Sequence, residues 1–194
     1  MGRELDLILA TQKGNISAIK RLLGTTKKGV FRNKVSPNFQ DSRGYTPLHH
    51  AIMYGQKEAL LMLLRYGADP RISDRSGNYP LHTTCQQGDY DSLQLLVEHS
   101  PIRPEIDQQN ANDDTSLIIA AQEGMYALVE FLLRAGADPH ITNKLDQNCL
   151  ELASYYGRKD VVSDLSSLKH FNPYPKVHLS VFLQNGLVIY VKSV

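Results

Sequence analysis

The sequence predicts an all-α solenoid of about five stacked helix-turn-helix repeats, followed by a short tail that we expect to form a β-hairpin. Three observations lead to this prediction. A fixed pattern of small, glycine and apolar residues recurs along the chain. The recurrences share one spacing, apart from two insertions. Near the C-terminus the apolar residues change from a helical to an alternating period, which is typical of strands.

The recurring pattern is a small residue, a glycine four positions later, and an apolar pair beginning eight positions after that glycine. It occurs five times, at Ala10/Gly14/Leu22-Leu23, Ala51/Gly55/Leu63-Leu64, Thr84/Gly88/Leu96-Val97, Ala120/Gly124/Leu132-Leu133 and, with a single leucine, Ala153/Gly157/Leu165. Successive small residues are 41, 33, 36 and 33 positions apart. The period is therefore 33 residues with insertions in segments 24–37 and 99–105, where loops between repeats tolerate extra length.

The second unit shows why each repeat should contain two helices. Thr46 is a suitable N-cap and Pro47 suits the first helical position, where its missing N–H costs nothing. This helix should end near Gly55. A second helix should follow and end at Gly67, shortly before Pro70. Because two such short helices cannot bury their apolar faces alone, neighbouring units must stack on one another.

The period and the motifs together resemble the ankyrin repeat across roughly residues 3–168. "YTPLHHAIMYG" (45–55) is near the consensus, and "EFLLRAGADP" (130–139) repeats its Gly-Ala-Asp ending, whereas the third to fifth units drift from the consensus. Asp113 and Asp146 replace the glycines found at Gly44 and Gly77, and Asp tolerates left-handed backbone better than most residues. We expect an array over residues 1–168, with repeats near 3–37, 41–73, 74–109, 110–142 and 143–168.

The opening resembles the N-terminal array of the caskins and of the related ankyrin-repeat and SAM-domain adaptors. "MGRELDLILATQKGNISAIKRLL", the Lys-bearing insertion "GTTKKG" and "SPNFQDSRGYTPLHHA" carry this resemblance. It implies a cytoplasmic signalling adaptor or scaffold that binds other proteins. Those adaptors continue with further repeats and domains, so whether this chain is complete, truncated or an alternative product stays open.

Two features mark the C-terminal end of the array and the tail at 169–194. Ser166 stands in place of the second apolar residue of the fifth pair, and a polar outer helix is what the end of a solenoid requires. Beyond "NPYP" (172–175), "VHLSVFL" (177–183) alternates in polarity and "LVIYV" (187–191) is β-branched and aromatic. Asn185-Gly186 between them is a strong signal for a tight turn. The sequence leaves open whether this tail packs on the last repeat.

The charge balance favours no particular class of charged partner. The 21 Lys and Arg residues nearly cancel the 20 Asp and Glu residues, so no whole-protein field attracts nucleic acid or an anionic membrane. The chain has neither a run of about 20 apolar residues nor a basic start of the signal-peptide kind, so we expect a cytoplasmic protein. The two cysteines, Cys85 and Cys149, lack zinc-site spacing and are expected to be buried thiols.

The adjacent His49 and His50 suggest a catalytic or metal-binding site, but the repeat pattern favours a structural role for His49. Neighbouring helical residues point about 100° apart, so the two imidazoles cannot easily share one metal ion. His82 occupies the position of His49 in the next unit, which predicts a structural role in hydrogen bonding the helix start and the adjoining loop. With no catalytic, phosphate-binding or metal motif visible, we expect neither an enzyme nor a metal or cofactor site.

What remains is a binding surface on the loop tips and the inner helices. By resemblance, partners of ankyrin arrays dock there, and His50 faces the groove. The predicted partner-binding residues are Arg43, Tyr45, His50, Met53, Tyr54, Arg75, Asn78, Gln86, Gln87, Gln122, Glu123, Tyr155 and Tyr156. Tyr and Arg lead this set because they give large contact area and hydrogen bonds together, although any one tyrosine could instead pack between repeats.

Three readings of the function remain open at this point. The first is the adaptor module that binds a protein partner. The second is a regulatory ankyrin protein that inhibits a kinase or retains a transcription factor. The third is contact with phosphoinositides or nucleic acid through segment 24–37, which carries Lys27, Lys28, Arg32 and Lys34 and no acid, although such a loop is more often simply solvated. The partner's identity and the oligomeric state are not encoded in any motif.

Overall fold

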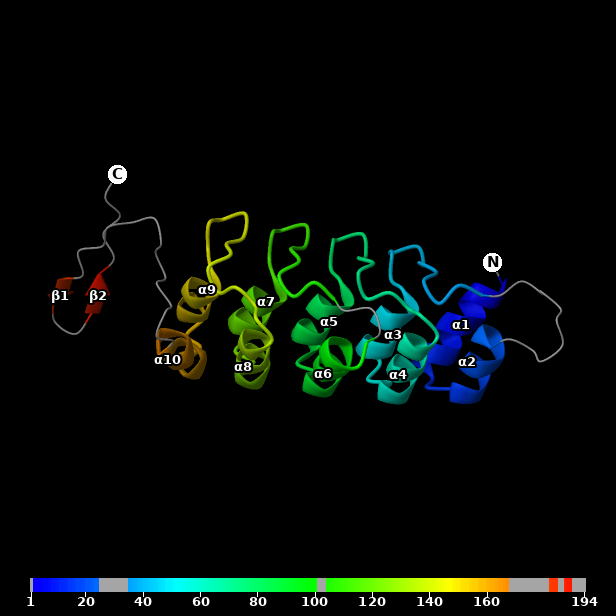
Figure 1. Ribbon diagram of the computed structural model, residues 1–194. Coiled ribbons are helices and arrows are strands. Elements are labelled where there is room, and N and C mark those ends of the chain that lie inside the picture. Colours follow the sequence, from blue (N-terminus) through cyan, green and yellow to red (C-terminus); the bar gives the residue numbers. More distant parts are fainter. Residues whose placement is uncertain (1, 25–34, 101–103, 168–181, 185–186, 190–194) are drawn as a thin grey trace.

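The computed structural model describes residues 2–24, 35–100, 104–167, 182–184 and 187–189. These residues form ten α-helices and one pair of strands (Figure 1). The helices are α1 (Gly2–Gln12), α2 (Ile16–Leu23), α3 (Pro47–Met53), α4 (Lys57–Arg65), α5 (Pro80–Gln87), α6 (Tyr90–Glu98), α7 (Ser116–Glu123), α8 (Tyr126–Arg134), α9 (Cys149–Tyr155) and α10 (Lys159–Ser167). The all-α repeat solenoid predicted from the sequence is therefore confirmed.

The local signals of the second repeat act as predicted. Thr46 is the N-cap of α3 in extended backbone, and Pro47 is the first helical residue. Just past α3, Gly55 adopts left-handed backbone with φ 64°, so the chain reverses without the steric cost a side chain would bring. Gly67, with φ 81°, likewise follows the end of α4.

The helices form two rows along the solenoid axis, and the loops between repeats form a third row beside them (Figure 1). Each odd-numbered helix, called an inner helix from here on, contacts the next odd-numbered helix. Each even-numbered helix, called an outer helix, contacts the next even-numbered one. Within a repeat the two helices also pack against each other. Every repeat is therefore covered by its neighbours, as short amphipathic helices require.

The anchors of the sequence pattern are the core of this stack. All five small residues are buried, and so is the first leucine of every apolar pair, listed as Leu22, Leu63, Leu96, Leu132 and Leu165. Burying one such leucine completely stabilises the fold by about 2 kcal/mol. Ser166, which replaces the second apolar residue in the last pair, is exposed. A polar residue at this position of α10 therefore leaves the core intact.

The two aspartates that replace glycine in the loops adopt left-handed backbone, as predicted. Asp113 and Asp146 have φ values of 60° and 56°, in the same left-handed region as Gly44 and Gly77. Aspartate is one of the few residues with a side chain that adopts this region at modest cost. The loops of the last two repeats therefore keep the shape set by glycine in the preceding ones.

The tail contains an antiparallel strand pair, as predicted. Strand β1 (Phe182–Gln184) pairs with β2 (Leu187–Ile189), with Leu183 opposite Val188. The described strands are shorter than the predicted segments. The turn at 185–186, the hinge at 172–175, the remaining tail residues and the basic stretch at 25–34 lie outside the described residues. Within the residues described, no helix has both the length and the apolar character needed to cross a lipid bilayer.

Candidate functional site: two grooves between the loops and the inner helices

Each loop tip is shaped by one aspartate or asparagine side chain. In the second repeat, Oδ1 of Asp41 accepts hydrogen bonds from the backbone N–H groups of Arg43 (2.8 Å) and Tyr45 (2.9 Å). The same pair of bonds, to the residues two and four positions on, recurs at Asp74, Asn110 and Asn143. Such turns replace lost backbone partners within the loop itself. Four successive tips therefore share one geometry.

Neighbouring tips are also joined to each other by backbone hydrogen bonds. The N–H of Arg75 donates to the carbonyl of Arg43 at 3.1 Å. Equivalent bonds join Ala111 to Ser76 and Lys144 to Asn112, each at 3.0 Å. Because every tip is fixed internally and to the next one, the row of loops presents a preformed wall rather than independent segments.

His49 and His82 tie this wall to the inner helices, which confirms the structural role predicted for them. Nδ1 of His49 accepts from the N–H of Thr46 (3.1 Å), so Nε2 carries the proton and donates to the carbonyl of Asn78 (3.0 Å). His82 makes the same pair of contacts, with Tyr79 and Asp114. Burial lowers the pKa of both imidazoles, and that of His82 falls to about 4, so both rings are neutral near pH 7.

The first groove lies in the second repeat, between its loop tip and α3. This aromatic groove has a volume of about 250 Å³ and is lined by Asp41, Arg43, Tyr45, His50, Met53 and Tyr54. The His50 ring meets the Tyr45 ring edge-on, with centres 5.8 Å apart, and is tilted relative to the Tyr54 ring, with centres 6.3 Å apart. All five partner-binding residues predicted in this repeat therefore line one concavity.

His50 lines this groove with little of its surface exposed, and its contact with a partner stays a prediction. The residue is 6% exposed, and both ring nitrogens have partners within the protein. Nε2 lies 2.9 Å from Oδ2 of Asp41, and Nδ1 lies 3.2 Å from Nε2 of Gln12 in the first repeat. His50 therefore forms the floor of the groove and holds Asp41, leaving Tyr54, which is 54% exposed, as the accessible aromatic residue.

Asp41, the acid of the aromatic groove, is stabilised in its ionised form by hydrogen bonds from within the protein. Burial by itself would raise the pKa of the Asp41 carboxyl, but the Arg43 N–H, the His50 ring and the Tyr45 N–H together bring it below its ordinary value. Asp41 is thus ionised at neutral pH, with internal donors already bonded to both oxygens. The exposed Arg43 adds a positive charge at the rim.

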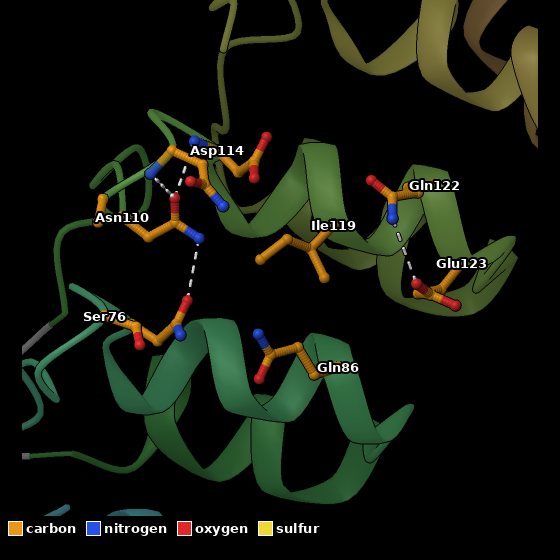
Figure 2. A pocket seen from close by; sticks show the side chains of 10 residues that line it. Ser76, Gln86, Asn110, Asp114, Ile119, Gln122 and Glu123 are labelled. Carbon is orange, nitrogen blue, oxygen red and sulfur yellow. Dashed lines mark hydrogen bonds between the residues drawn. The ribbon is translucent and has the colours of Figure 1, made fainter. Parts of the chain in front are cut away.

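The second groove, larger than the first, lies between the third and fourth repeats (Figure 2). We call it the carboxamide groove because five of its lining residues are Asn or Gln. It has a volume of about 380 Å³ and is lined by Ser76, Asn78, Gln86, Asn110, Ala111, Asn112, Asp114, Ile119, Gln122 and Glu123. Nδ2 of Asn110 donates to Oδ1 of Asn78 at 2.9 Å, which joins the two loop tips across the repeat boundary.

Asp114 is the half-buried acid of the carboxamide groove. Burial raises the pKa of its carboxyl above the ordinary value and nearby Asp113 adds to the rise, while hydrogen bonds from Asn143 and Asn112 oppose it. The Asn143 amide lies 3.1 Å from Oδ1 of Asp114. No basic residue is among the described residues that line this groove. The charge of Asp114 is therefore only partly offset by neutral donors.

Of the other predicted partner-binding residues, some line the carboxamide groove and the rest line neither groove. Asn78, Gln86, Gln122 and Glu123 line the carboxamide groove. Arg75 and Gln87 are exposed near these residues in sequence but line neither groove. Tyr155 and Tyr156 are exposed at the end of α9, with their rings 5.1 Å apart and nearly perpendicular. These two tyrosines belong to a separate part of the same row of inner helices.

Asp41 and Asn110, which shape the loop tips beside the grooves, were missed by sequence reasoning. Asp41 and Asn110 line the grooves and shape their tips, and Ile119 lies centrally in the carboxamide groove (Figure 2). A usable signal was present, because Asp or Asn recurs at 41, 74, 110 and 143 with the spacing of the repeats. A polar residue that recurs in register with a turn is expected to have a structural task in that turn.

Both cysteines are buried in the described part of the chain. Cys85 and Cys149 are buried free thiols, and burial raises the pKa of each to about 12. A thiol with such a pKa is almost entirely protonated at neutral pH and reacts poorly. Among the residues that the structure describes, no group of three or more His, Cys, Asp or Glu is placed to hold a metal ion.

Comparison with known proteins agrees with this architecture. The family model for ankyrin repeats in three copies matches residues 7–74 and 60–143. Ankyrin repeat and sterile alpha motif domain-containing protein 1B of Danio rerio is 40% identical over 158 residues, which cover 74% of this chain and 12% of that protein. Ankyrin repeat and SAM domain-containing protein 1A of Homo sapiens is 52% identical over 102 residues, covering 53% and 9%.

A shorter match is found with human Caskin-2, which is 35% identical over 69 residues, or 33% of this chain and 6% of that protein. The resemblance to these two adaptor groups is thereby confirmed. The chain spans 12% or less of the length of these three relatives. The match of the family model over more than half of the sequence, together with the ten stacked helices described, shows that the chain belongs to the ankyrin-repeat family.

Proposed function

We propose that this chain is a protein-interaction module of a cytoplasmic signalling adaptor or scaffold, and that a partner protein docks on the loop tips and the inner helices. The observation that carries the proposal is the pair of grooves on this face, formed by loop tips and inner helices of the second to fourth repeats. Nine of the thirteen residues predicted to bind a partner line these grooves. Open grooves on a fixed surface suit the docking of a partner protein.

Rigid presentation is the mechanism of this binding. The loop tips are fixed by the side chains of Asp41, Asp74 and Asn110 and by backbone bonds between neighbours. A partner therefore meets a surface whose polar groups are already in place. Little conformational entropy remains to be lost on docking, and this raises affinity at a given contact area.

The relatives support the adaptor part of the proposal. Two of them carry a sterile alpha motif or SAM domain in their names, and the match to this chain covers 12% and 9% of their lengths. An array that resembles one part of a larger multidomain protein is suited to bringing a bound partner close to other domains. Any catalytic activity in the assembly would then belong to the partner.

The test compares exposed residues on the two sides of the array. The double substitution Arg43→Ala and Tyr54→Ala removes two exposed groups from the aromatic groove. Tyr45 is less suitable because its ring also packs against His49 and His50 at 5.7 and 5.8 Å, so its loss would disturb the fold. Tyr126→Ala is the matched control, since Tyr126 is 43% exposed on the outer helix α8.

Partners captured by the wild-type chain are identified by mass spectrometry, and a purified partner is then titrated against each variant by calorimetry. We expect the groove variant to weaken binding about tenfold or more, because hot-spot residues of these types contribute that much. The Tyr126 variant should bind like the wild type, and urea unfolding should show equal stability for all three. Equal binding by the groove variant and the control would refute docking on this face.

A further inference from the structure

Two arginines lie side by side on the loop tips beside the aromatic groove. The backbone N–H of Arg75, at the tip of the third repeat, donates to the carbonyl of Arg43, at the tip of the second, at 3.1 Å. Both residues are exposed, and Arg43 lines the aromatic groove. Because the two backbones are bonded to each other and arginine side chains are long and flexible, both guanidinium groups are within reach of one small anion.

Neither of these guanidinium groups has a partner among the residues that the structure describes. Two other cations on the same side of the array do have one. Nζ of Lys144 donates to the carbonyl of Ala111 at 2.6 Å, and Nε of Arg158 donates to the carbonyl of Gln122 at 2.9 Å. Arg43 and Arg75 therefore keep their donors available for a ligand.

The acids of the same two tips are directed into their own loops. Both oxygens of Asp41 have donors within the protein, and its side chain is 20% exposed. Oδ1 of Asp74 accepts two backbone N–H groups of its own loop, each at 2.8 Å, and the residue is 9% exposed. A ligand that approaches from solvent therefore meets the guanidinium groups before the carboxylates. The exposed Ser42 and Ser76 beside the arginines add hydroxyl donors.

The concavity next to these arginines suits an apolar side chain. The aromatic groove has a volume of about 250 Å³, and Tyr45, Met53 and Tyr54 line it. Tyr54 is 54% exposed, so its ring offers contact area without rearrangement. A concavity of this size receives a single side chain, whereas a flat lipid surface does not enter it. The combination favours a peptide over a membrane as the source of the anion.

We propose that the second and third repeats bind an extended segment of the partner protein that places an aspartate or glutamate against Arg43 and Arg75 and an apolar side chain in the aromatic groove. The proposal rests on the proposed function, because it names the chemistry of the partner that docks on this face. The guanidinium groups donate charge-assisted hydrogen bonds to the carboxylate, whose two oxygens match the forked donors of arginine. The apolar side chain packs against Met53 and Tyr54, which removes apolar surface from water.

The test uses a phage-displayed library of random linear peptides selected on the intact chain. Selected peptides are then titrated against the wild type, the tip variant Arg43→Gln/Arg75→Gln and the control Arg21→Gln/Arg65→Gln. Arg21 and Arg65 are exposed in the last turns of the outer helices α2 and α4. Both double variants change the formal charge from +1 to −1 (two positive charges removed). The tip variant keeps the bonds that shape the tips, since these use backbone N–H groups and not guanidinium groups.

We expect the selected peptides to carry an Asp or Glu within a few residues of an aromatic or aliphatic residue. The tip variant should bind them about tenfold more weakly, because each exposed ion pair contributes up to about fivefold, while the control stays within about twofold of the wild type. Replacing the acid of a selected peptide by its amide should weaken binding to the wild type about tenfold and leave binding to the tip variant nearly unchanged. Raising NaCl from about 0.05 M to about 0.5 M should weaken binding to the wild type more steeply than binding to the tip variant.

Three outcomes of the peptide experiment would overturn the inference: no selected peptide, peptides without enrichment in Asp or Glu, and equal binding by the tip variant and the control. If the arginines serve a lipid surface instead, phosphatidylserine vesicles will retain the wild type and not the tip variant, while peptide binding shows no such difference. If a purified partner still loses affinity on Tyr54→Ala in any of these cases, the proposed function stands while this inference fails. If neither peptides nor a partner respond to any substitution in the grooves or at the tips, the proposed function itself fails.

Discussion

Nε2 of His49 lies 3.0 Å from the backbone carbonyl oxygen of Asn78, twenty-nine residues further along the chain. One imidazole therefore joins the start of α3, through the N–H of Thr46, to the loop of the next repeat. His82 repeats the arrangement one repeat later, with its Nε2 3.0 Å from the carbonyl of Asp114. The residues that fix the helix starts thus also fix the wall of the grooves.

The first prediction concerns the dependence of stability on pH. Burial lowers the pKa of His82 to about 4, below its ordinary value of 6.5, so between these values the unfolded chain binds more protons than the folded one. The stabilising contribution of the neutral imidazole is complete above pH 6.5 and is lost as the pH falls toward 4. For this one residue the loss reaches about 3 kcal/mol. Urea unfolding at a series of pH values measures it.

Substitution separates His82 from the acids that titrate in the same range. His82→Gln removes the titrating group and keeps an amide donor for the carbonyl of Asp114, so the fall in stability between pH 6.5 and 4 should become shallower. If His82→Gln and the wild type lost stability in parallel, the buried imidazole would not be the cause.

The second prediction concerns the two thiols. Because burial raises the pKa of Cys85 and Cys149 to about 12, neither forms thiolate to a useful extent at pH 8. We expect a thiol reagent such as Ellman's reagent to label the folded chain only as fast as local opening exposes each sulfur. In concentrated urea both thiols should react within the mixing time. Rapid labelling of the folded chain would show that one thiol is accessible.

The elements that could be predicted from the sequence are those specified by residues close together in the chain. Thr46, Pro47, Gly55 and Gly67 each determine a helix end through their own backbone preference, so the two helices of the second repeat were predicted near their observed bounds. The five repeats followed from the recurrence of buried leucines such as Leu63, because stacking requires the same buried position in each unit. The turn glycine and the buried leucine recur in the weaker repeats, at Gly88, Gly124 and Gly157 and at Leu96, Leu132 and Leu165.

The grooves could be predicted only in part, because their geometry depends on contacts between distant residues. The sequence does not indicate that the two ring nitrogens of His50 bond Gln12 of the first repeat and Asp41 of the loop. The carboxamide groove likewise requires Asn110 to meet Asn78 across 32 positions. A repeat pattern identifies which positions face a shared surface, but not which side chains will satisfy one another there.

The third prediction compares two glycines with similar left-handed backbone. Gly77 has φ 75°, and a Cβ atom at this residue would lie 2.6 Å from the backbone nitrogen of Ala111 in the next loop. Gly67 has φ 81°, but a Cβ atom there would meet nothing within 4 Å. Gly67→Ala should cost about 1 kcal/mol, the usual cost of a side chain in this region. Gly77→Ala should cost clearly more, because backbone atoms must also move.

Urea unfolding of the two glycine variants under the same conditions provides the measurement, and each variant serves as the control for the other. The difference between them isolates the close approach of neighbouring loops from the backbone preference that both share. Equal destabilisation by the two substitutions would mean that the loops separate freely, in conflict with the wall described for the grooves.

The last prediction ranks two substitutions of Asn110. Its Oδ1 accepts from the N–H groups of Asn112 (2.8 Å) and Asp114 (3.1 Å), while its Nδ2 donates to Asn78 (2.9 Å). Asn110→Asp keeps the acceptor, as Asp41 does in its own loop, but it replaces the donor to the neighbouring tip by a negatively charged oxygen. Asn110→Ala loses both. We expect costs of about 1 kcal/mol and about 2–3 kcal/mol, respectively, because the second variant leaves two N–H groups without their partner.

A double-mutant cycle decides whether the bond between tips contributes as this ranking assumes. In the background Asn78→Ala the acceptor for Nδ2 is gone, so Asn110→Asp should cost less there than in the wild type, while Asn110→Ala should still destabilise the loop. Equal costs of Asn110→Asp in both backgrounds would show that the bond to Asn78 contributes nothing. Equal costs of Asn110→Asp and Asn110→Ala would show instead that the turn does not depend on its side-chain acceptor. Because Asn110 and Asn78 both line the carboxamide groove, the cycle also measures how firmly the groove is formed before a partner arrives.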